Sequence, residues 1–277
     1  MLNLNTPVET YLVENTEIDV KRDDLHNGDL DLPPWSKLEG VRQLLLSDYF
    51  DKKKPIVHLT IRGSYTGWAL SYFGKEYGYD IKIAYPKTKS YPQEMLDKIT
   101  QYGGELIPLR HNMVAILSSQ VKKMAKERGW QMSPDAFNHP VYVKSWRERS
   151  ASFFQEKDYQ TLVIQGGSGV TSVGIIQSFL GVDYIAGQMF EPPYGGKKVI
   201  IISTSSVKTV KSALTLNMGS VPSCVEVYKS EYDFYDEMPS HTTPFPCNHL
   251  WDKKAWVWIT QNVGELNGRT LFWNLGA

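Results

Sequence analysis

Three glycines, a serine and a threonine lie together in residues 166–171, directly after an apolar run at 160–165. The run predicts a β-strand, and the pattern at 172–180 predicts a helix. A glycine loop between a strand and a helix offers free backbone N–H groups and hydroxyls, which can hold a phosphate dianion. The segment lacks the Gly-Lys-Ser/Thr of a Walker loop and the glycine spacing of the dinucleotide fingerprint. We expect a phosphate site, and the alternative is a tight turn whose glycines serve packing.

A second candidate anion site follows the apolar run at 55–61. Residues 62–67 read Arg-Gly-Ser-Tyr-Thr-Gly, and a helical pattern continues from there to Tyr77 and ends at Gly78. The first amides of a helix point unpaired N–H groups outward, and α/β folds place anions at such turns. This turn is therefore a candidate site for a carboxylate or a phosphate.

A lysine and an aspartate complete the set of candidate residues. Lys37 falls in the first turn of a helix predicted over residues 35–49, with Ser36 as its N-cap. The helix dipole favours anions at that end and gives a lysine no advantage. Asp252 follows Trp251 and precedes two lysines. Taken singly, both residues are ordinary surface charges, and their chemistry depends on what the fold brings near them.

The elements expected around these residues alternate between strands and helices. Residues 55–110 repeat a strand, helix, strand, helix, strand order, which predicts a parallel sheet covered by helices. Further helices are expected over 112–128 and 142–157, and further strands over 17–21 and 198–203. The last third of the chain shows a less regular pattern. The predicted fold class is α/β.

Composition limits the function classes. The chain has 277 residues, of which 42% are hydrophobic and 22% charged, enough for one large domain or two modest ones. Thirty basic residues balance thirty acidic ones, so the net charge does not require a nucleic-acid or membrane partner. Cys224 and Cys247 suit buried free thiols rather than disulfides or a metal site. Neither a signal peptide nor an apolar stretch of about 20 residues is present, so we expect a cytoplasmic protein.

Taken in order, these segments resemble the fold-type II pyridoxal phosphate (PLP) enzymes of the tryptophan synthase β superfamily, especially the 1-aminocyclopropane-1-carboxylate (ACC) deaminase and D-cysteine desulfhydrase branch. The similar segments are Lys-Arg-Asp-Asp-Leu at 21–25 followed by Lys37, Thr-Gly-Trp-Ala-Leu-Ser-Tyr-Phe-Gly at 66–74, Gly-Ser-Gly-Val-Thr at 167–171, Leu-Trp-Asp-Lys-Lys-Ala-Trp at 250–256 and Phe-Trp-Asn-Leu-Gly at 272–276. The ordered set covers most of the chain. It implies a two-domain α/β fold, with a small domain at 54–147 inserted into a large cofactor-binding domain formed by 1–53 and 148–277.

The resemblance also implies a role for each candidate residue. Lys37 would form the Schiff base with PLP and then move the Cα proton of the substrate. Asp252 would keep the pyridine nitrogen protonated, which makes the cofactor a strong electron sink. The implied cofactor contacts are Lys37, Gly167, Ser168, Gly169, Val170, Thr171, Trp251, Asp252 and Tyr65. The implied substrate contacts, for a carboxylate, are Ser64, Tyr65, Thr66 and Gly67.

Two departures from the family pattern limit the reaction. Tyr65 stands where cysteine synthases have the asparagine that contacts the cofactor's 3-hydroxyl, and Trp251 replaces a tyrosine that the deaminases use at the substrate. The second departure argues against ring-opening deamination. Leu275 stands where the deaminase branch is also apolar and the desulfhydrases carry threonine.

The function implied is a PLP-dependent lyase that works through a Cα carbanion (quinonoid), by decarboxylation or by elimination or deamination. Its substrate would be an amino acid, free or attached to a nucleotide or DNA, and it would be a homodimer without a membrane partner. In its brevity the chain resembles compact phage-encoded members, which decarboxylate an amino acid on modified thymidine during DNA hypermodification. Lys52, Lys53, Lys54, Lys87 and Lys89 could then supply phosphate contacts. The alternatives are a catalytically inactive ligand-binding homologue and a phosphate-dependent α/β enzyme without PLP.

Overall fold

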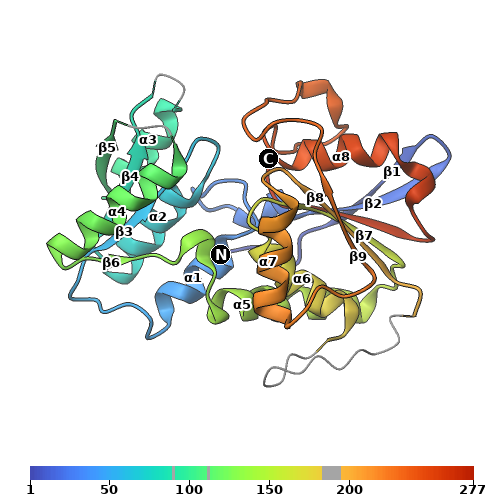
Figure 1. Ribbon diagram of the computed structural model, residues 1–277, viewed down its shortest axis with the longest axis horizontal. Helices are drawn as coiled ribbons and strands as arrows, with labels where there is room; N and C mark the ends of the chain where they lie inside the picture. Colours follow the sequence, from blue (N-terminus) through green and yellow to red (C-terminus); the bar gives the residue numbers. More distant parts are fainter. Residues whose placement is uncertain (89–90, 111–112, 183–194) are drawn as a thin grey trace. The chain divides into compact units, whose positions relative to one another are not determined.

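The computed structural model describes residues 1–88, 91–110, 113–182 and 195–277. These residues form two compact units (Figure 1). Unit 1 comprises Met1–Asp29, Pro34–Lys37 and Val143–Ala277, and unit 2 comprises Leu30–Pro33 and Leu38–Tyr142. No helix among the described residues is both long and apolar enough to cross a membrane. Of the two cysteines, Cys247 is buried and Cys224 is partly exposed.

Unit 1 is built on a six-stranded sheet with the order β1-β2-β10-β7-β8-β9. Its first pair is antiparallel, and all its other neighbours are parallel. The strands are β1 (Val8–Val13), β2 (Thr16–Arg22), β7 (Thr161–Gly166), β8 (Lys198–Ser203), β9 (Val225–Lys229) and β10 (Thr270–Asn274), and the helices are α5 (Pro140–Glu156), α6 (Val170–Leu180), α7 (Val207–Met218) and α8 (Asp252–Gln261). Short 3-10 turns lie at Asp23–Asn27, Ser240–Thr242 and Val263–Glu265.

Alternate side chains of the central strands face two different layers of helices. Phe272 of β10 packs against Trp256 of α8, with ring centroids 5.8 Å apart. The next residue, Trp273, packs against Phe153 and Phe154 of α5 on the other face. Helices therefore cover both faces of the sheet, as Figure 1 shows for α8 against α5 and α6. This explains why these strands are apolar along their whole length.

Unit 2 is built on a four-stranded parallel sheet with the order β5-β4-β3-β6. Its strands are β3 (Ile56–Leu59), β4 (Ile81–Pro86), β5 (Glu105–Leu109) and β6 (Gln131–Met132), and its helices are α1 (Leu38–Leu46), α2 (Thr66–Tyr77), α3 (Gln93–Gln101) and α4 (Val114–Arg128), with a 3-10 turn at Asp135–Phe137. The predicted strand and helix order of residues 55–110 is confirmed. Gly78 takes the left-handed conformation (φ 76°) and ends α2, as its position in the sequence predicts.

The structure differs from the sequence expectations in three places. The helix expected over 35–49 is shorter, and the hydroxyl of Ser36 has no hydrogen-bond partner among the described residues, so it is not a side-chain cap. The last third is regular, since it holds α7, β9, α8 and β10. Helix α1 lies in unit 2, although residues 1–53 were assigned to the large domain. Tyr79 and Arg42 explain this, since Tyr79 donates to the carbonyl of Leu45 and Arg42 donates to a tyrosine of α2.

A close helix crossing in unit 1 depends on Gly174 of α6. A Cβ atom added there would lie 2.5 Å from the Cβ of Trp146 and 2.7 Å from the carbonyl oxygen of Val143, both in α5. Backbone atoms cannot move aside as a flexible side chain can. The glycine therefore sets how closely α5 approaches α6.

Gly174→Ala should lower the free energy of unfolding by about 1–3 kcal/mol, because the added methyl group forces the two helices apart. Urea unfolding followed by circular dichroism measures the loss. Gly264→Ala is the matched control, since a Cβ at Gly264 meets no atom within 4 Å. Equal unfolding midpoints for the two variants would contradict the prediction.

Candidate active site

The backbone just before Lys37 is fixed by the end of β10. Ser36 donates its N–H to the carbonyl of Leu275 at 2.9 Å, and Ala277 donates to the carbonyl of Pro34 at 3.0 Å. An isolated antiparallel bridge between Trp35 and Gly276 lies between these bonds. Lys37 is the last residue before α1 and is half-buried. Its position is therefore set by a central strand of the unit 1 sheet.

Asp252 is held by the same residue of the C-terminal segment. It begins α8, is 3% exposed, and accepts a hydrogen bond through Oδ1 from the N–H of Leu275 at 3.1 Å. The carbonyl of Leu275 bonds to Ser36, the residue before Lys37. One peptide residue thus connects the carboxylate to the segment that carries the lysine.

The electrostatics of Lys37 and Asp252 follow from their removal from water. Burial raises the pKa of Asp252 to about 7, while the Leu275 N–H and the charge of Lys37 act in the opposite direction. Burial lowers the pKa of Lys37, and Asp252 opposes that shift. Each group is displaced toward its neutral form. A partly neutral lysine amine is a nucleophile, and a carboxyl group that titrates near neutrality can hold or release a proton.

The glycine loop between β7 and α6 has the shape of an anion cradle. Gly169 is the N-cap of α6 with φ 84°, and no side chain caps the helix start. A Cβ added to Gly167 would meet only the side-chain nitrogen Nε2 of Gln165, at 3.8 Å, so the loop is open at that point. Ser205 donates its hydroxyl to the carbonyl of Gly167 at 2.5 Å, which fixes the loop. The amides at the start of α6 therefore have room for an oxyanion.

The sheet of unit 1 brings these groups to one edge. Strands β10, β7 and β8 are parallel neighbours, and Gly166 at the end of β7 pairs with Ser203 at the end of β8. Leu275 follows β10 at the same carboxyl edge, where α/β proteins bind their ligands. The side-chain oxygen of Ser203 is buried there without a hydrogen-bond partner among the described residues. Lys37, Asp252 and the glycine loop thus belong to one edge of one sheet.

The other predicted cofactor residues of unit 1 lie in the glycine loop and at the start of α8. Val170 and Thr171 are the first two residues of α6 and are buried, and Ser168 is partly exposed. Trp251 is the N-cap of α8, and its indole N–H is buried without a partner among the residues that the structure describes. The backbone N–H of Trp251 donates to the side-chain oxygen of Asn248 at 3.1 Å. The geometry is compatible with an aromatic wall beside Asp252.

The predicted substrate residues lie in unit 2, at the start of α2. Tyr65 is the N-cap, and Thr66 and Gly67 are the first two residues of the helix. The hydroxyls of Ser64 and Thr66 are 2.8 Å apart. Ser64 also accepts the Thr66 N–H at 3.3 Å, so the start of α2 gathers two hydroxyls and helix-start amides, the groups that bind anions.

His58 was missed by the sequence analysis. It is buried in β3, its Nε2 lies 2.7 Å from the Thr66 hydroxyl, and its Nδ1 lies 2.6 Å from the Ser133 hydroxyl. Burial lowers the pKa of His58 to about 4, so the ring is neutral and one nitrogen can accept a hydrogen bond. A histidine inside an otherwise apolar strand is the signal that could have revealed it.

Buried charges in unit 1 support the lysine segment from the other side. Arg149 of α5 donates to the carbonyl of Ser36 at 3.1 Å and to Asp23 at 2.7 Å. Trp273 donates its indole N–H to the other oxygen of Asp23 at 2.6 Å. The Lys-Arg-Asp-Asp-Leu stretch therefore links α5, β10 and the residue before Lys37. Arg149 was not among the predicted residues.

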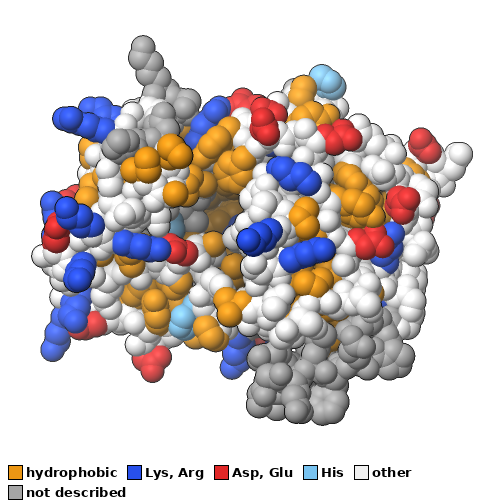
Figure 2. Space-filling view, in the orientation of Figure 1, with side chains coloured by type: hydrophobic (Ala, Val, Ile, Leu, Met, Phe, Trp, Pro, Cys, Tyr) orange, Lys and Arg blue, Asp and Glu red, His pale blue; other side chains and the backbone are white. Residues whose placement is uncertain are grey.

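The basic residues considered for nucleic-acid contact lie in unit 2. Lys52, Lys53, Lys54 and Lys87 are exposed, and Lys89 lies outside the described residues. On the face drawn in Figure 2, basic side chains of this unit lie with acidic ones among them.

The residues present fit the cofactor that the family resemblance implies. An amine with a lowered pKa suits an aldehyde, the open glycine loop suits a phosphate, and a buried carboxyl group suits a pyridine nitrogen. All three belong to unit 1.

Comparison with known proteins also points to PLP-dependent enzymes. No family model matches the chain. Over 290 aligned residues, covering all of both chains, it is 26% identical to a glycyl-dTMP PLP-dependent decarboxylase of Pseudomonas phage M6. A solved ACC deaminase homologue superposes with a TM-score of 0.74 at 17% identity, covering 98% of this chain and 89% of the other. Escherichia coli diaminopropionate ammonia lyase superposes with a TM-score of 0.65 at 15% identity, covering 98% and 82%. The predicted α/β fold with parallel sheets flanked by helices is confirmed.

Asp252→Asn should stabilise the cofactor-free protein at alkaline pH. The folded pKa of Asp252, about 7, lies above the ordinary 3.8, so the unfolded chain loses this proton first. Stability therefore falls as pH rises between these values, and the full penalty applies above the folded pKa. Asparagine removes the ionisation and can still accept the Leu275 N–H. The gain should be on the order of 4 kcal/mol at about pH 8.5 and should vanish near about pH 4.

Urea unfolding at the two pH values measures this difference. Asp29→Asn, at an exposed position of unit 1, is the control and should change stability little at either pH. A gain for Asp252→Asn that is equal at both pH values would show that burial does not raise its pKa.

Proposed function

We propose that this chain, a homologue of a phage decarboxylase with the fold of the fold-type II PLP enzymes, is a PLP-dependent lyase that decarboxylates an amino acid attached to a thymidine nucleotide. The observation that carries the proposal is the pair of hydrogen bonds made by Leu275. Its N–H donates to Asp252, and its carbonyl accepts from Ser36, the residue before Lys37. The relative, whose name specifies glycyl-dTMP, supplies the substrate class.

Lys37 is proposed to hold the cofactor through its amine. Burial lowers its pKa, so a larger fraction of the amine is neutral at physiological pH and can attack an aldehyde. The same amine would supply the proton that replaces the lost carboxylate at Cα. Its backbone is held by the Ser36 to Leu275 bond, so the lysine is presented from a rigid strand end.

The glycine loop is proposed to hold the cofactor phosphate. Gly167, Ser168, Gly169, Val170 and Thr171 form the turn and the first residues of α6, whose N-cap is a glycine and so supplies no capping side chain. Helix N-termini stabilise a phosphate dianion through these N–H groups and the helix dipole. The open space at Gly167 leaves room for the oxygen atoms.

Asp252 is proposed to hold a proton at the pyridine nitrogen. When bound, PLP with a protonated ring accepts the electrons of the bond that breaks at Cα. Leu275 orients the carboxylate by donating to Oδ1. Trp251, which precedes Asp252, and Tyr65 at the start of α2 are proposed as further cofactor contacts.

The start of α2 is proposed to bind the substrate. Ser64, Thr66 and Gly67, together with Tyr65, would receive a carboxylate or phosphate oxygen through hydroxyls and amides. His58 is neutral and fixes the Thr66 hydroxyl, so it acts as a positioning residue. A homodimer and a cytoplasmic location remain part of the proposal, and light scattering of the purified protein tests the first.

Borohydride reduction of the holoenzyme should fix PLP onto Lys37, as measured by mass spectrometry of peptides. Lys37→Met should abolish the label and the visible absorbance band. Lys21→Met is the matched control, because Lys21 is also buried with a lowered pKa and should leave the label on Lys37 unchanged. A label on another lysine in the wild-type protein would refute the assignment of Lys37.

The reaction itself is tested with glycyl-dTMP, free or within an oligonucleotide. A product lighter by the mass of carbon dioxide supports decarboxylation and requires Lys37. Release of ammonia instead would assign the chain to the elimination and deamination lyases, represented among the solved structures by the ammonia lyase. PLP bound at Lys37 with neither product would indicate a ligand-binding homologue.

A further inference from the structure

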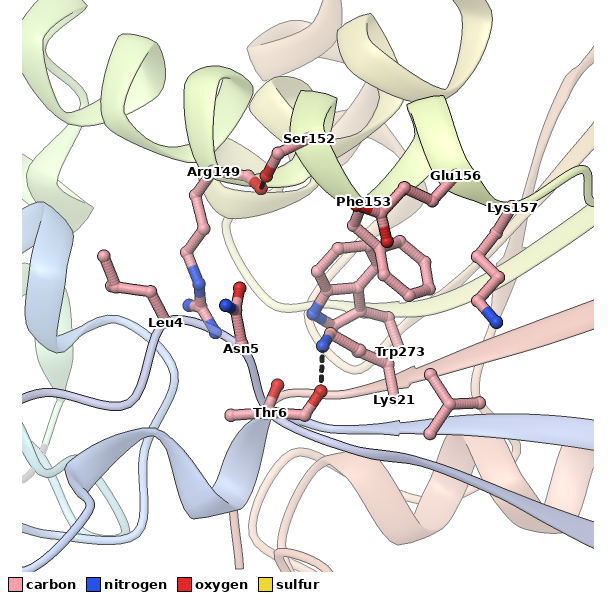
Figure 3. A pocket seen from close by; sticks show the side chains of 11 residues that line it. Leu4, Asn5, Thr6, Lys21, Arg149, Ser152, Phe153, Glu156, Lys157 and Trp273 are labelled. Atoms are coloured by element: carbon pink, nitrogen blue, oxygen red, sulfur yellow. Dashed lines mark hydrogen bonds between the residues drawn. The ribbon is translucent and has the colours of Figure 1, made fainter.

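A cavity of about 440 Å³ lies in unit 1, and none of its lining residues is among those assigned to cofactor or substrate. Figure 3 shows α5 along one side and the segment before β1, with β2, along the other. Its volume falls within the range of small-molecule sites. The residues that matter for its chemistry are Lys21, Arg149, Phe153 and Trp273.

Lys21 brings a buried positive charge to this cavity. It is 5% exposed, and its ammonium group donates to the carbonyl of Thr6 and lies 4.8 Å from the centre of the Phe153 ring (Figure 3). No carboxylate among the described residues forms an ion pair with it. An ammonium group has three protons to donate, so two remain for a ligand. Burying such a charge is costly unless a partner is supplied.

Asp23, the acid whose charge acts on Lys21, already has other partners. Asp23 accepts hydrogen bonds from Thr6 at 2.5 Å, Arg149 at 2.7 Å and Trp273 at 2.6 Å. Burial lowers the pKa of Lys21 to about 8, Asp23 opposes this, and the positive charge of Arg149 adds to it. Lys21 is therefore a buried cation whose acidic neighbour is already shared among three other donors, and an anion in the cavity would compensate its charge.

We infer that this cavity binds a small organic acid, whose carboxylate or phosphate pairs with Lys21 and whose apolar part packs against Phe153 and Trp273. Both aromatic rings line the cavity and pack edge to face, with centroids 5.5 Å apart. Glu156 and Lys157 also line it, one of each charge. Binding in this cavity does not depend on the proposed function, because no residue proposed to hold the cofactor lines it. Only the absorbance readout described below rests on that proposed function.

The site has a physical connection to Lys37. Arg149 lines the cavity and donates to the carbonyl of Ser36, the residue before the lysine. A bound anion attracts the Arg149 guanidinium and so competes with that hydrogen bond. Occupancy of the cavity should therefore shift the absorbance of the holoenzyme, in addition to producing heat of binding.

Isothermal titration with benzoate and with phenyl phosphate tests the inference on the holoenzyme. Lys21→Met should raise the Kd at least about 10-fold, because the charge that pairs with the anion is lost. Lys21→Arg, which keeps the charge, should stay within about 3-fold of wild type. Lys144→Met is the control, since Lys144 is an exposed residue of α5 that does not line the cavity.

The inference would be overturned if Lys21→Met bound the probes with wild-type affinity. It would also be overturned if neither benzoate nor phenyl phosphate bound to the wild-type protein. Crystals of the wild-type holoenzyme grown with 4-bromobenzoate give a test that needs no variant. A bromine anomalous peak between Lys21 and Phe153 is expected, and peaks only elsewhere would also reject it. Borohydride labelling of Lys37 is measured separately, so failure here leaves the proposed function intact.

Discussion

The backbone of Leu275 is the constraint on which the candidate site depends. Its N–H places the Asp252 carboxylate, and its carbonyl places the backbone before Lys37. Hydrogen bonds are directional, and both of these start from one residue, so neither group can move far without breaking its bond to Leu275. Because Leu275 follows a strand with neighbours on both sides, the rigidity of the sheet is passed to the acid and the amine.

Buried charge makes this arrangement specific. Asp23 has three donors and Arg149 bonds both to it and to Ser36, so desolvation is offset by complete partnering. Removing one member would leave the other charge buried without a partner. The free energy lost in that way exceeds the free energy that the intact pair contributes. Asp252 shows the opposite case, since its raised pKa records a desolvation that the Leu275 N–H, its own backbone N–H and the charge of Lys37 offset only in part.

Local patterns in the sequence predicted the elements that are defined locally. The strand at 198–203 has its predicted bounds, and the glycine loop lies between a strand and a helix as expected. The regular elements of the last third were missed because their apolar residues contact residues that are distant in sequence. Phe272 packs on Trp256, and β10 pairs with β2. The proximity of Lys37 and Asp252 came from a family resemblance, since no local pattern encodes contacts between residues so far apart in sequence. His58 was missed because its partners, too, are set by tertiary structure.

The order of strands has a consequence for biosynthesis. β10 lies between β2 and β7, although it is synthesised after both of them. Until then β2 has no parallel neighbour, and both strands present open hydrogen-bonding edges. Such non-local pairing slows folding and leaves a nascent chain open to chaperones and to aggregation. The bonds that Leu275 makes to Ser36 and Asp252 can therefore form only after β10 has been synthesised and has joined the sheet.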